Sequence, residues 1–269
     1  MLKEQAIANQ LPLPVDEIVK DYRLAYQSRQ ASIIGRREVF SGKAKFGIFG
    51  DGKELANLAI ARAFRKGDWR SGYYRDQTWM FALNVMSIQE YFAQMYAHAD
   101  VNAEPHTGGR SMNAHFASRY INPDGSWRDQ TDTYNVAADL SPTAAQMPRA
   151  VGLAYASVLY RNLPSLHEFR RFSRNGDEVT FATIGNASTA EGMFWESVNA
   201  IGVLKAPAVI VVYDDGLGIS VTNEFQIVKE DIYEIMQGFR RKPAGNGYDL
   251  YQVHGWDYLT LVETFLPLA

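Results

Sequence analysis

Two apolar runs in the second half of the chain are each followed by side chains that could bind a charged ligand. Residues 179–184 lead into Gly185-Asn186-Ala187-Ser188, and residues 208–213 lead into Asp214-Asp215-Gly216. Small residues and free backbone N–H groups at a helix start suit a phosphate group. Amide and carboxylate oxygens suit Mg²⁺, which a bound diphosphate would carry with it. The pattern predicts a diphosphate–magnesium site, with Asn186 and Asp215 as ligands and a main-chain carbonyl beyond Gly216 as a third.

Each turn also has an ordinary structural reading. Asn is a common turn former, and Asp-Asp-Gly is a common turn tripeptide. Neither Gly-x-Gly-x-x-Gly nor Gly-x-x-x-x-Gly-Lys-Ser/Thr occurs in the chain, which argues against a dinucleotide-binding fold and against a P-loop.

The elements around these turns form a strand–helix–strand pattern. Residues 190–204 have helical character and separate the two apolar runs. Continuously apolar, β-branched runs predict parallel strands in a sheet that helices cover on both faces. We therefore expect an α/β fold. Further expected elements are a strand at 250–253, helices at 54–66, 148–159 and 258–265, and a helix capped by Ser87 with Glu90. Residues 103–139 are expected to form a long loop, and a loop of this length is usually functional or disordered.

The length and composition limit the possible classes of protein. The chain has 269 residues, 46% of them hydrophobic and 21% charged, which is typical of a globular protein. A net charge of −3 argues against nucleic-acid binding. The lack of cysteine excludes disulfides, thiolate metal sites and a cysteine nucleophile. No apolar run of ~18 residues and no signal-peptide pattern is present, so we expect no membrane span and a cytoplasmic location.

Four segments in order resemble one family of thiamine-diphosphate enzymes. The family's cofactor motif opens with Gly-Asp-Gly or Gly-Glu-Gly and closes with Asn-Asn; here 28 residues separate Asn186 from Asp215. The chain is similar to the alpha subunit of the decarboxylating component of 2-oxo acid dehydrogenase complexes, nearest the branched-chain (2-oxoisovalerate) type. The upstream segments that carry this resemblance are Tyr73-Tyr74-Arg75-Asp76, residues 109–116 and residues 141–152.

The resemblance implies a thiamine-diphosphate-binding fold and a role for each matching residue. It implies an N-terminal helical arm at 1–30 and a cofactor domain at 31–269 that is truncated at its C-terminal end. The implied catalytic residues are His115 and Arg110. The implied cofactor-binding residues are Tyr74, Arg75, Ser141, Thr143, Gly185, Ala187, Ser188 and Tyr213, and the implied Mg²⁺ ligands are Asn186, Asp215 and the main-chain carbonyl of Leu217.

The chain departs from the family at several of these positions. The metal carboxylate and the metal amide have changed places, which leaves Asn186 at the first turn and Asp215 at the second. One carboxylate and one amide oxygen remain, so the site reads as compensated. Ala187 replaces a Gly, Leu217 replaces a Tyr and Tyr213 replaces an Arg. Plain structural readings stay open for three residues: a surface ion pair for Arg75, a packed loop residue for His115 and a core residue for Tyr74.

The resemblance implies oxidative decarboxylation of a 2-oxo acid, with acyl transfer to a lipoyl group. This chain would supply the diphosphate and Mg²⁺ half of the site. The implied partners are a beta subunit or a fused beta region and a lipoyl-bearing acyltransferase, in a homo- or hetero-oligomer, with no nucleic acid and no membrane. The alternatives are a cofactor-free paralogue with a structural role, or another thiamine-diphosphate enzyme of the pyruvate, acetoin or transketolase-like type.

Overall fold

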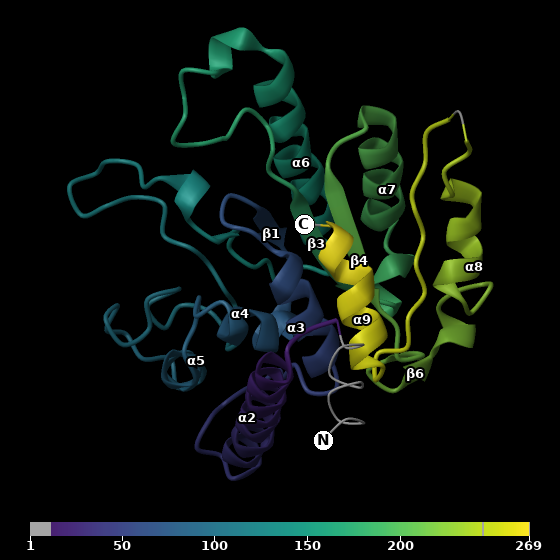
Figure 1. The fold of residues 1–269 in the computed structure, drawn as a ribbon. Coiled ribbons are helices and arrows are strands. Elements are labelled where there is room, and N and C mark those ends of the chain that lie inside the picture. The colour runs from purple at the N-terminus through teal and green to yellow at the C-terminus, as the bar shows by residue number, and fades with distance from the viewer. Residues whose placement is uncertain (1–11, 244, 269) are drawn as a thin grey trace, which may run out of the picture. The chain divides into compact units, whose positions relative to one another are not determined.

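A computed structural model describes residues 12–243 and 245–268 of the chain (Figure 1). Contacts between residues divide it into two compact units. The sheet unit comprises Lys66–Tyr73 and Ala117–Gln252. The helical unit comprises the described parts of Met1–Arg65, Tyr74–Phe116 and Val253–Ala269. Within the described ranges, no helix has the length and apolar character needed to cross a membrane.

The described part of the sheet unit contains a four-stranded parallel sheet of order β2-β1-β3-β4. The longest pair, β3 with the edge strand β4, runs in register from Thr180↔Ala208 to Gly185↔Tyr213. Its strands and α7 form the predicted strand–helix–strand unit. The elements of this unit are β1 (Trp69–Ser71), η2 (Gln130–Asp132), β2 (Asn135–Val136), α6 (Gln146–Asn162), η3 (Pro164–Leu166), β3 (Thr180–Gly185), η4 (Ala187–Ala190), α7 (Gly192–Leu204), β4 (Ala208–Tyr213), β5 (Leu217–Gly218), β6 (Val221–Thr222), η5 (Asn223–Phe225), α8 (Ile232–Met236) and η6 (Gln237–Phe239).

Helices α6 and α7 contact each other, and α6 packs on β1 and β3 (Figure 1). Small residues on α6, such as Ala150, let its backbone approach the sheet, where Ala182 and Ile184 of β3 are fully buried. Phe194 and Val198 of α7 complete this core. The burial of continuously apolar strands under helices stabilises a parallel sheet. The predicted fold class is confirmed: the fold is α/β, with a parallel sheet flanked by helices, and an N-terminal helix precedes it in the chain.

Four short strands, β1, β2, β5 and β6, were not predicted from the sequence, and one predicted strand is absent from the described residues. β1 has three residues and β2 has two, which is too short for any periodic pattern to show. The strand predicted at 250–253 is wrong, since the described structure has no strand there. Tyr251 and Gln252 are exposed, and the nearest pairing is an isolated bridge between Arg240 and Tyr248. Residues 250–253 are a short run of mixed polarity, and they are neither fully buried nor paired with a neighbouring strand.

The helical unit packs α3 against α4 and α9 around Leu58, Trp79 and Val262. The predicted helix at 258–265 is confirmed with the same bounds, and Ser87 and Glu90 form the predicted capping box of α5. The elements of this unit are α2 (Val15–Phe40), α3 (Glu54–Ala63), η1 (Tyr74–Asp76), α4 (Gln77–Ala82), α5 (Ile88–Met95), α9 (Tyr258–Phe265) and η7 (Leu266–Leu268).

Residues 1–11 of the predicted helical arm lie outside the described residues. Helix α2 begins at Val15 and continues to Phe40, beyond the predicted arm. The domain boundary at residue 30 stays a prediction.

Helix α2 buries small residues and exposes large apolar ones. Its buried side carries Ser28, Ala31, Ser32 and Gly35. A Cβ at Gly35 would lie 2.4 Å from the Phe49 ring, so this close approach requires glycine. The opposite side exposes large apolar residues that recur mostly at spacings of three and four. The members of this α2 stripe are Val15, Val19, Tyr22, Tyr26, Ile33 and Phe40. An exposed stripe of this size is typical of a protein–protein contact surface.

A buried ion pair links the sheet to the segment that precedes α6. The Arg70 side chain on β1 is 0% exposed, and its Nη1 atom lies 3.1 Å from Oδ1 of Asp139. The Nη2 atom of Arg70 donates to the main-chain carbonyl of Tyr73 at 2.9 Å. Because a buried charge that loses its partner is costly, this pair holds the chain ends of β1 and of residues 137–139 in one arrangement.

We predict that Asp139→Ala lowers the free energy of unfolding by about 3–5 kcal/mol, because Arg70 would stay buried without its carboxylate. Urea unfolding followed by circular dichroism measures the change. The matched control is Asp132→Ala, which breaks the solvated pair between Lys66 and Asp132 and should cost about 0–1 kcal/mol. Equal losses in the two variants would show that the buried pair does not hold this region.

Candidate functional site

In the sheet unit, the carboxyl ends of β3 and β4 lie side by side. Gly185 pairs with Tyr213, and the N–H of Asn186 donates to the Tyr213 carbonyl at 3.0 Å. The predicted turns therefore meet at one edge of the sheet, where open parallel sheets bind ligands. The sequence prediction that Asn186 and Asp215 follow neighbouring strands is confirmed. Their role as metal ligands stays a prediction.

The first turn closes directly after β3. Thr189 donates to the Asn186 carbonyl through both Oγ1 (2.6 Å) and its N–H (3.0 Å), which bends the chain into η4. Ala187 and Ser188 lie in η4 and are half-buried. Beside this turn the rings of Tyr73 and Tyr213 stack with centroids 6.1 Å apart. Tyr213, one of the predicted cofactor-binding residues, thus forms an aromatic wall with Tyr73.

The second turn presents two carboxylates. Asp214 Oδ1 accepts from the N–H of Gly216 at 3.0 Å, and Asp215 Oδ1 accepts from the N–H of Leu217 at 3.2 Å. Leu217 begins the β5–β6 hairpin, which folds back over the first turn. A Cβ at Gly218 would lie 2.6 Å from the Cβ of Ala187, so the two turns approach each other closely at this glycine.

Asn223 is a residue of this edge that the sequence analysis missed. Its Oδ1 accepts from the Asn186 Nδ2 group at 2.6 Å. Its own Nδ2 donates to the Glu230 carbonyl at 2.9 Å and to Asp214 Oδ1 at 3.3 Å. No spacing rule marks Asn223, because the β5–β6 hairpin alone brings it back to β3.

The oxygen atoms at this edge match the ligand chemistry of Mg²⁺. The Asn186 NH₂ group donates to Asn223, so Oδ1 is the other polar atom of the Asn186 side chain. The Asp215 carboxylate and the Leu217 carbonyl would complete a set of three hard oxygen ligands, as Mg²⁺ prefers. Among the described residues, no group of three or more Asp, Glu, His or Cys side chains is arranged to hold a metal ion. A cation site here would thus depend on amide and carbonyl oxygens as well as one carboxylate.

Ser141 and Thr143 lie in the exposed turn before α6. The buried side chain of Gln146 fixes the base of this turn, since its Nε2 donates to the Thr183 carbonyl at 3.0 Å. The Ser71 hydroxyl donates to the Gln146 carbonyl at 2.8 Å. The turn is therefore tied to both β1 and β3, and its two predicted residues stay accessible.

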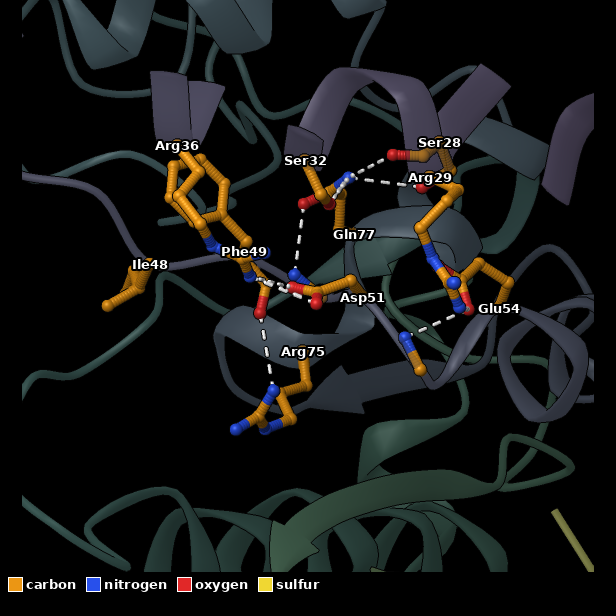
Figure 2. Close-up of polar contacts among 12 residues, drawn as sticks. Ser28, Arg29, Ser32, Arg36, Ile48, Phe49, Asp51, Glu54, Arg75 and Gln77 are labelled. Carbon is orange, nitrogen blue, oxygen red and sulfur yellow. Dashed lines mark hydrogen bonds and ion pairs between the residues drawn. The ribbon is translucent and has the colours of Figure 1, made fainter. Parts of the chain in front are cut away.

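In the helical unit, Tyr74 and Arg75 lie on η1. The Arg75 guanidinium stands over the Tyr74 ring, 5.1 Å from its centroid, in a cation–π arrangement. Its Nη1 donates to the Phe49 carbonyl at 3.3 Å (Figure 2). These contacts orient the guanidinium without neutralising it, because neither partner carries a charge.

A network of polar contacts holds the Phe49 segment that positions Arg75 (Figure 2). The N–H of Gly50 donates to Gln77 Oε1 at 3.1 Å, and Gln77 in turn donates to Ser28 and Ser32 of α2. Two arginines of α2 add ion pairs on either side. These pairs join Arg36 to Asp51 at 2.9 Å and Arg29 to Glu54 at 2.7 Å.

Arg110 and His115 lie on a loop that the buried carboxylate of Glu104 organises. Glu104 accepts hydrogen bonds from the Thr107 hydroxyl and from the N–H groups of His106, Thr107 and Gly109. Arg110 is exposed and donates to the Thr107 carbonyl at 3.2 Å. Nothing in the sequence pattern marked Glu104.

His115 is only 7% exposed. Its Nδ1 lies 3.3 Å from the Asn113 carbonyl, and Gln94 exchanges two hydrogen bonds with its backbone. A carbonyl only accepts, so the Nδ1 atom of His115 is the donor in this contact. The burial agrees with the packed-loop reading, and a catalytic role for His115 stays a prediction.

The Glu104 contacts predict a pH-dependent loop. Burial raises the pKa of the Glu104 carboxyl, but the hydrogen bonds from Thr107, Gly109 and His106 outweigh burial and hold that pKa below its ordinary value. The stabilisation is therefore complete above the unfolded-state pKa of about 4.3 and is lost as pH falls through the lower folded-state pKa.

We expect Glu104→Gln to lower the free energy of unfolding at pH 7 by about 1–3 kcal/mol, because a neutral amide cannot accept all of these bonds. Urea unfolding at a series of pH values should show the gap to wild type closing below about pH 4. The control is Glu263→Gln on the exposed side of α9, which should match wild type throughout. A gap that does not change with pH would contradict the ionised-carboxylate account.

Comparisons with known proteins place these features in a family. The family model described as dehydrogenase E1 component matches residues 22–253. The alpha subunit of 2-oxoisovalerate dehydrogenase from Bacillus subtilis (strain 168) is 28% identical over 216 residues, 80% of this chain and 56% of that protein. The mitochondrial 2-oxoisovalerate dehydrogenase subunit alpha 1 of Arabidopsis thaliana is 26% identical over 200 residues, 72% of this chain and 36% of that protein.

A pyruvate dehydrogenase E1 component subunit alpha, from Acholeplasma laidlawii, is 26% identical over 212 residues, 77% of this chain and 48% of that protein. The chain thus spans about half the length of the curated relatives it matches. Both the family match and the names of these relatives confirm the resemblance found in the sequence. Since the family model covers most of its length, the chain belongs to the dehydrogenase E1 component family.

Proposed function

We propose that this chain supplies the diphosphate- and Mg²⁺-binding half of a thiamine-diphosphate site in a 2-oxo acid dehydrogenase. The complete enzyme would decarboxylate a 2-oxo acid oxidatively and pass the acyl group to a lipoyl group. The observation that carries this proposal is the meeting of the two turns at the carboxyl ends of β3 and β4. Family membership supports it. Branched-chain 2-oxo acids are the favoured substrates, since two of the relatives are named for 2-oxoisovalerate.

In this proposal, one set of residues holds Mg²⁺, which would neutralise much of the diphosphate charge, and a second set contacts the diphosphate itself. Asn186 Oδ1, the Asp215 carboxylate and the Leu217 carbonyl would hold Mg²⁺. The backbone of Gly185, Ala187 and Ser188 would face the diphosphate, as small residues at a helix start allow. Tyr213 would flank it with its stacked partner Tyr73.

The remaining proposed residues would orient the ligand. Arg75, fixed by Tyr74 and by the Phe49 carbonyl, would donate a charge-assisted bond to the diphosphate. Ser141 and the backbone of Thr143 would lie against the aminopyrimidine ring. Arg110 and His115 would border the reacting centre. The cofactor, when bound, supplies the electron sink for the carbanion left by loss of CO₂.

Two alternative functions rest on specific observations. The exchange of amide and carboxylate between Asn186 and Asp215 keeps a cofactor-free, structural subunit open. The Acholeplasma laidlawii relative keeps pyruvate open as the substrate. An acetoin-cleaving or transketolase-like enzyme remains a third reading of the cofactor motif.

Calorimetric titration with thiamine diphosphate, first with Mg²⁺ and then with EDTA, tests the proposal on the protein assembled with its partner. We predict saturable, metal-dependent binding that Asp215→Ala abolishes, because the carboxylate is the one charged ligand of the proposed set. Glu196→Ala, at an exposed position of α7, should bind like wild type.

Unchanged binding in Asp215→Ala would refute the ligand assignment. A folded, assembled protein that binds no cofactor would instead favour the structural subunit. A panel of 2-oxo acids with an artificial electron acceptor then distinguishes the substrates.

The proposed assembly needs a surface for a second subunit, and the α2 stripe offers one. The relatives above are named as alpha subunits, so we propose a beta subunit, or a fused beta region, as the occupant of this stripe. A lipoyl-bearing acyltransferase would be a further partner of the complete enzyme.

We predict that Tyr22→Glu combined with Ile33→Glu weakens the association with the beta subunit at least about tenfold, since two charges would be buried in an apolar contact. Analytical ultracentrifugation of the purified subunits measures the affinity. Gln27→Glu, exposed on another side of α2, is the matched control and should bind normally. Normal assembly of the double variant, with unchanged thermal stability, would exclude the stripe as the beta-subunit surface.

A further inference from the structure

We propose that Asn223 is a positioning residue that sets the direction of the Asn186 amide, so that Asn186 presents Oδ1 rather than its NH₂ group to a cation. The same contact makes an amide, and not a carboxylate, the compatible side chain at position 186. The orientation of the amide follows from hydrogen-bond contacts alone. Its use toward Mg²⁺ rests on the proposed function.

The hydrogen-bond partners of Asn223 decide the direction of both amides. The Glu230 main-chain carbonyl can only accept, and it lies 2.9 Å from Asn223 Nδ2. The Asp214 carboxylate accepts from the same nitrogen at 3.3 Å. With its NH₂ group committed to these two acceptors, Asn223 turns Oδ1 the other way. That oxygen can only accept, so the Asn186 atom 2.6 Å away must be the donor Nδ2.

Burial makes this arrangement costly to reverse. Asn186 is 3% exposed and Asn223 is 8% exposed, so water cannot readily replace a lost partner. The backbone of both residues is also held. The N–H of Asn223 donates to the Gly216 carbonyl at 3.0 Å, and the N–H of Asn186 donates to the Tyr213 carbonyl. The backbone of either residue therefore cannot shift without breaking a main-chain contact of the two turns.

A carboxylate at position 186 would conflict with Asn223. One of its oxygens would face Asn223 Oδ1 across the present 2.6 Å contact, with no proton between them. Rotation of the Asn223 amide would relieve this repulsion, but its oxygen would then face the Glu230 carbonyl and the Asp214 carboxylate. An amide at position 186 is therefore the side chain that fits the Asn223 oxygen.

The first experiment uses the metal-free protein in EDTA and a double-mutant cycle of urea unfolding. We expect Asn186→Asp alone to raise the unfolding equilibrium constant at least about tenfold, since two buried acceptors would oppose each other. In the Asn223→Ser background, the same change should cost less than about threefold, because a serine hydroxyl can donate to the new carboxylate. Additive effects would overturn the inferred amide direction.

The second experiment measures Mn²⁺ affinity in the presence of thiamine diphosphate by electron paramagnetic resonance. In the protein that keeps Asn186, we expect Asn223→Ser to weaken Mn²⁺ binding at least about tenfold, because the Asn186 amide loses its orienting partner. In the Asn186→Asp protein, Asn223→Ser should instead strengthen it. A merely structural role of Asn223 would lower both affinities alike, and that result would overturn the proposal.

The two experiments separate this inference from the proposed function. A wild-type protein that binds no Mn²⁺ with the cofactor would sink the proposed function and the cation role of Asn223 together, while the metal-free cycle still decides the amide direction. If the wild-type protein binds Mn²⁺ but Asn223→Ser weakens that binding in both the wild-type and the Asn186→Asp proteins, the proposed function would stand and the inference would be overturned. If Asn223→Ser does not fold, Asn223→Thr provides the same hydroxyl donor on a branched side chain.

Discussion

The parallel pairing of β3 with β4 is the constraint on which the sheet unit depends. Six residue pairs in register, from Thr180↔Ala208 to Gly185↔Tyr213, end both strands at the same level. Because side chains and turns follow the backbone, a slip of one residue would move Asn186 away from the second turn. The register thus positions the core of Ala182 and Ile184 and the polar edge beyond them at the same time.

Buried polar groups then specify the loops around this pair. Arg70 with Asp139 fixes the segment before α6, and Gln146 fixes the start of α6 against β3. Asn223 follows a hairpin whose two strands have only two residues each, and its side chain joins the first turn to the second. Each contact satisfies a group that would be costly to bury alone, so the loops have one arrangement rather than several.

In the helical unit, too, buried polar contacts hold the segments that carry the predicted site residues. Helix α2 gives its small, polar side to Gln77 and to the Phe49 ring, and these hold the segment on which Arg75 rests. Its large apolar residues face outward instead, which is the reverse of a helix that serves its own core. Glu104 organises its loop from within, since four donors of the loop itself point to its carboxylate and Gln94 of α5 adds a fifth.

The sequence by itself determined the fold class, the β3–α7–β4 unit, the α5 capping box and α9, because each depends on local pattern or on short-range hydrogen bonds. It also located the turns that follow β3 and β4. Tertiary structure decided the four short strands β1, β2, β5 and β6, the absence of a strand at 250–253, and the roles of Asn223, Glu104 and Arg70. These features depend on contacts between residues far apart in the chain, and a single polar side chain carries no periodic signal of the partner that folding brings to it.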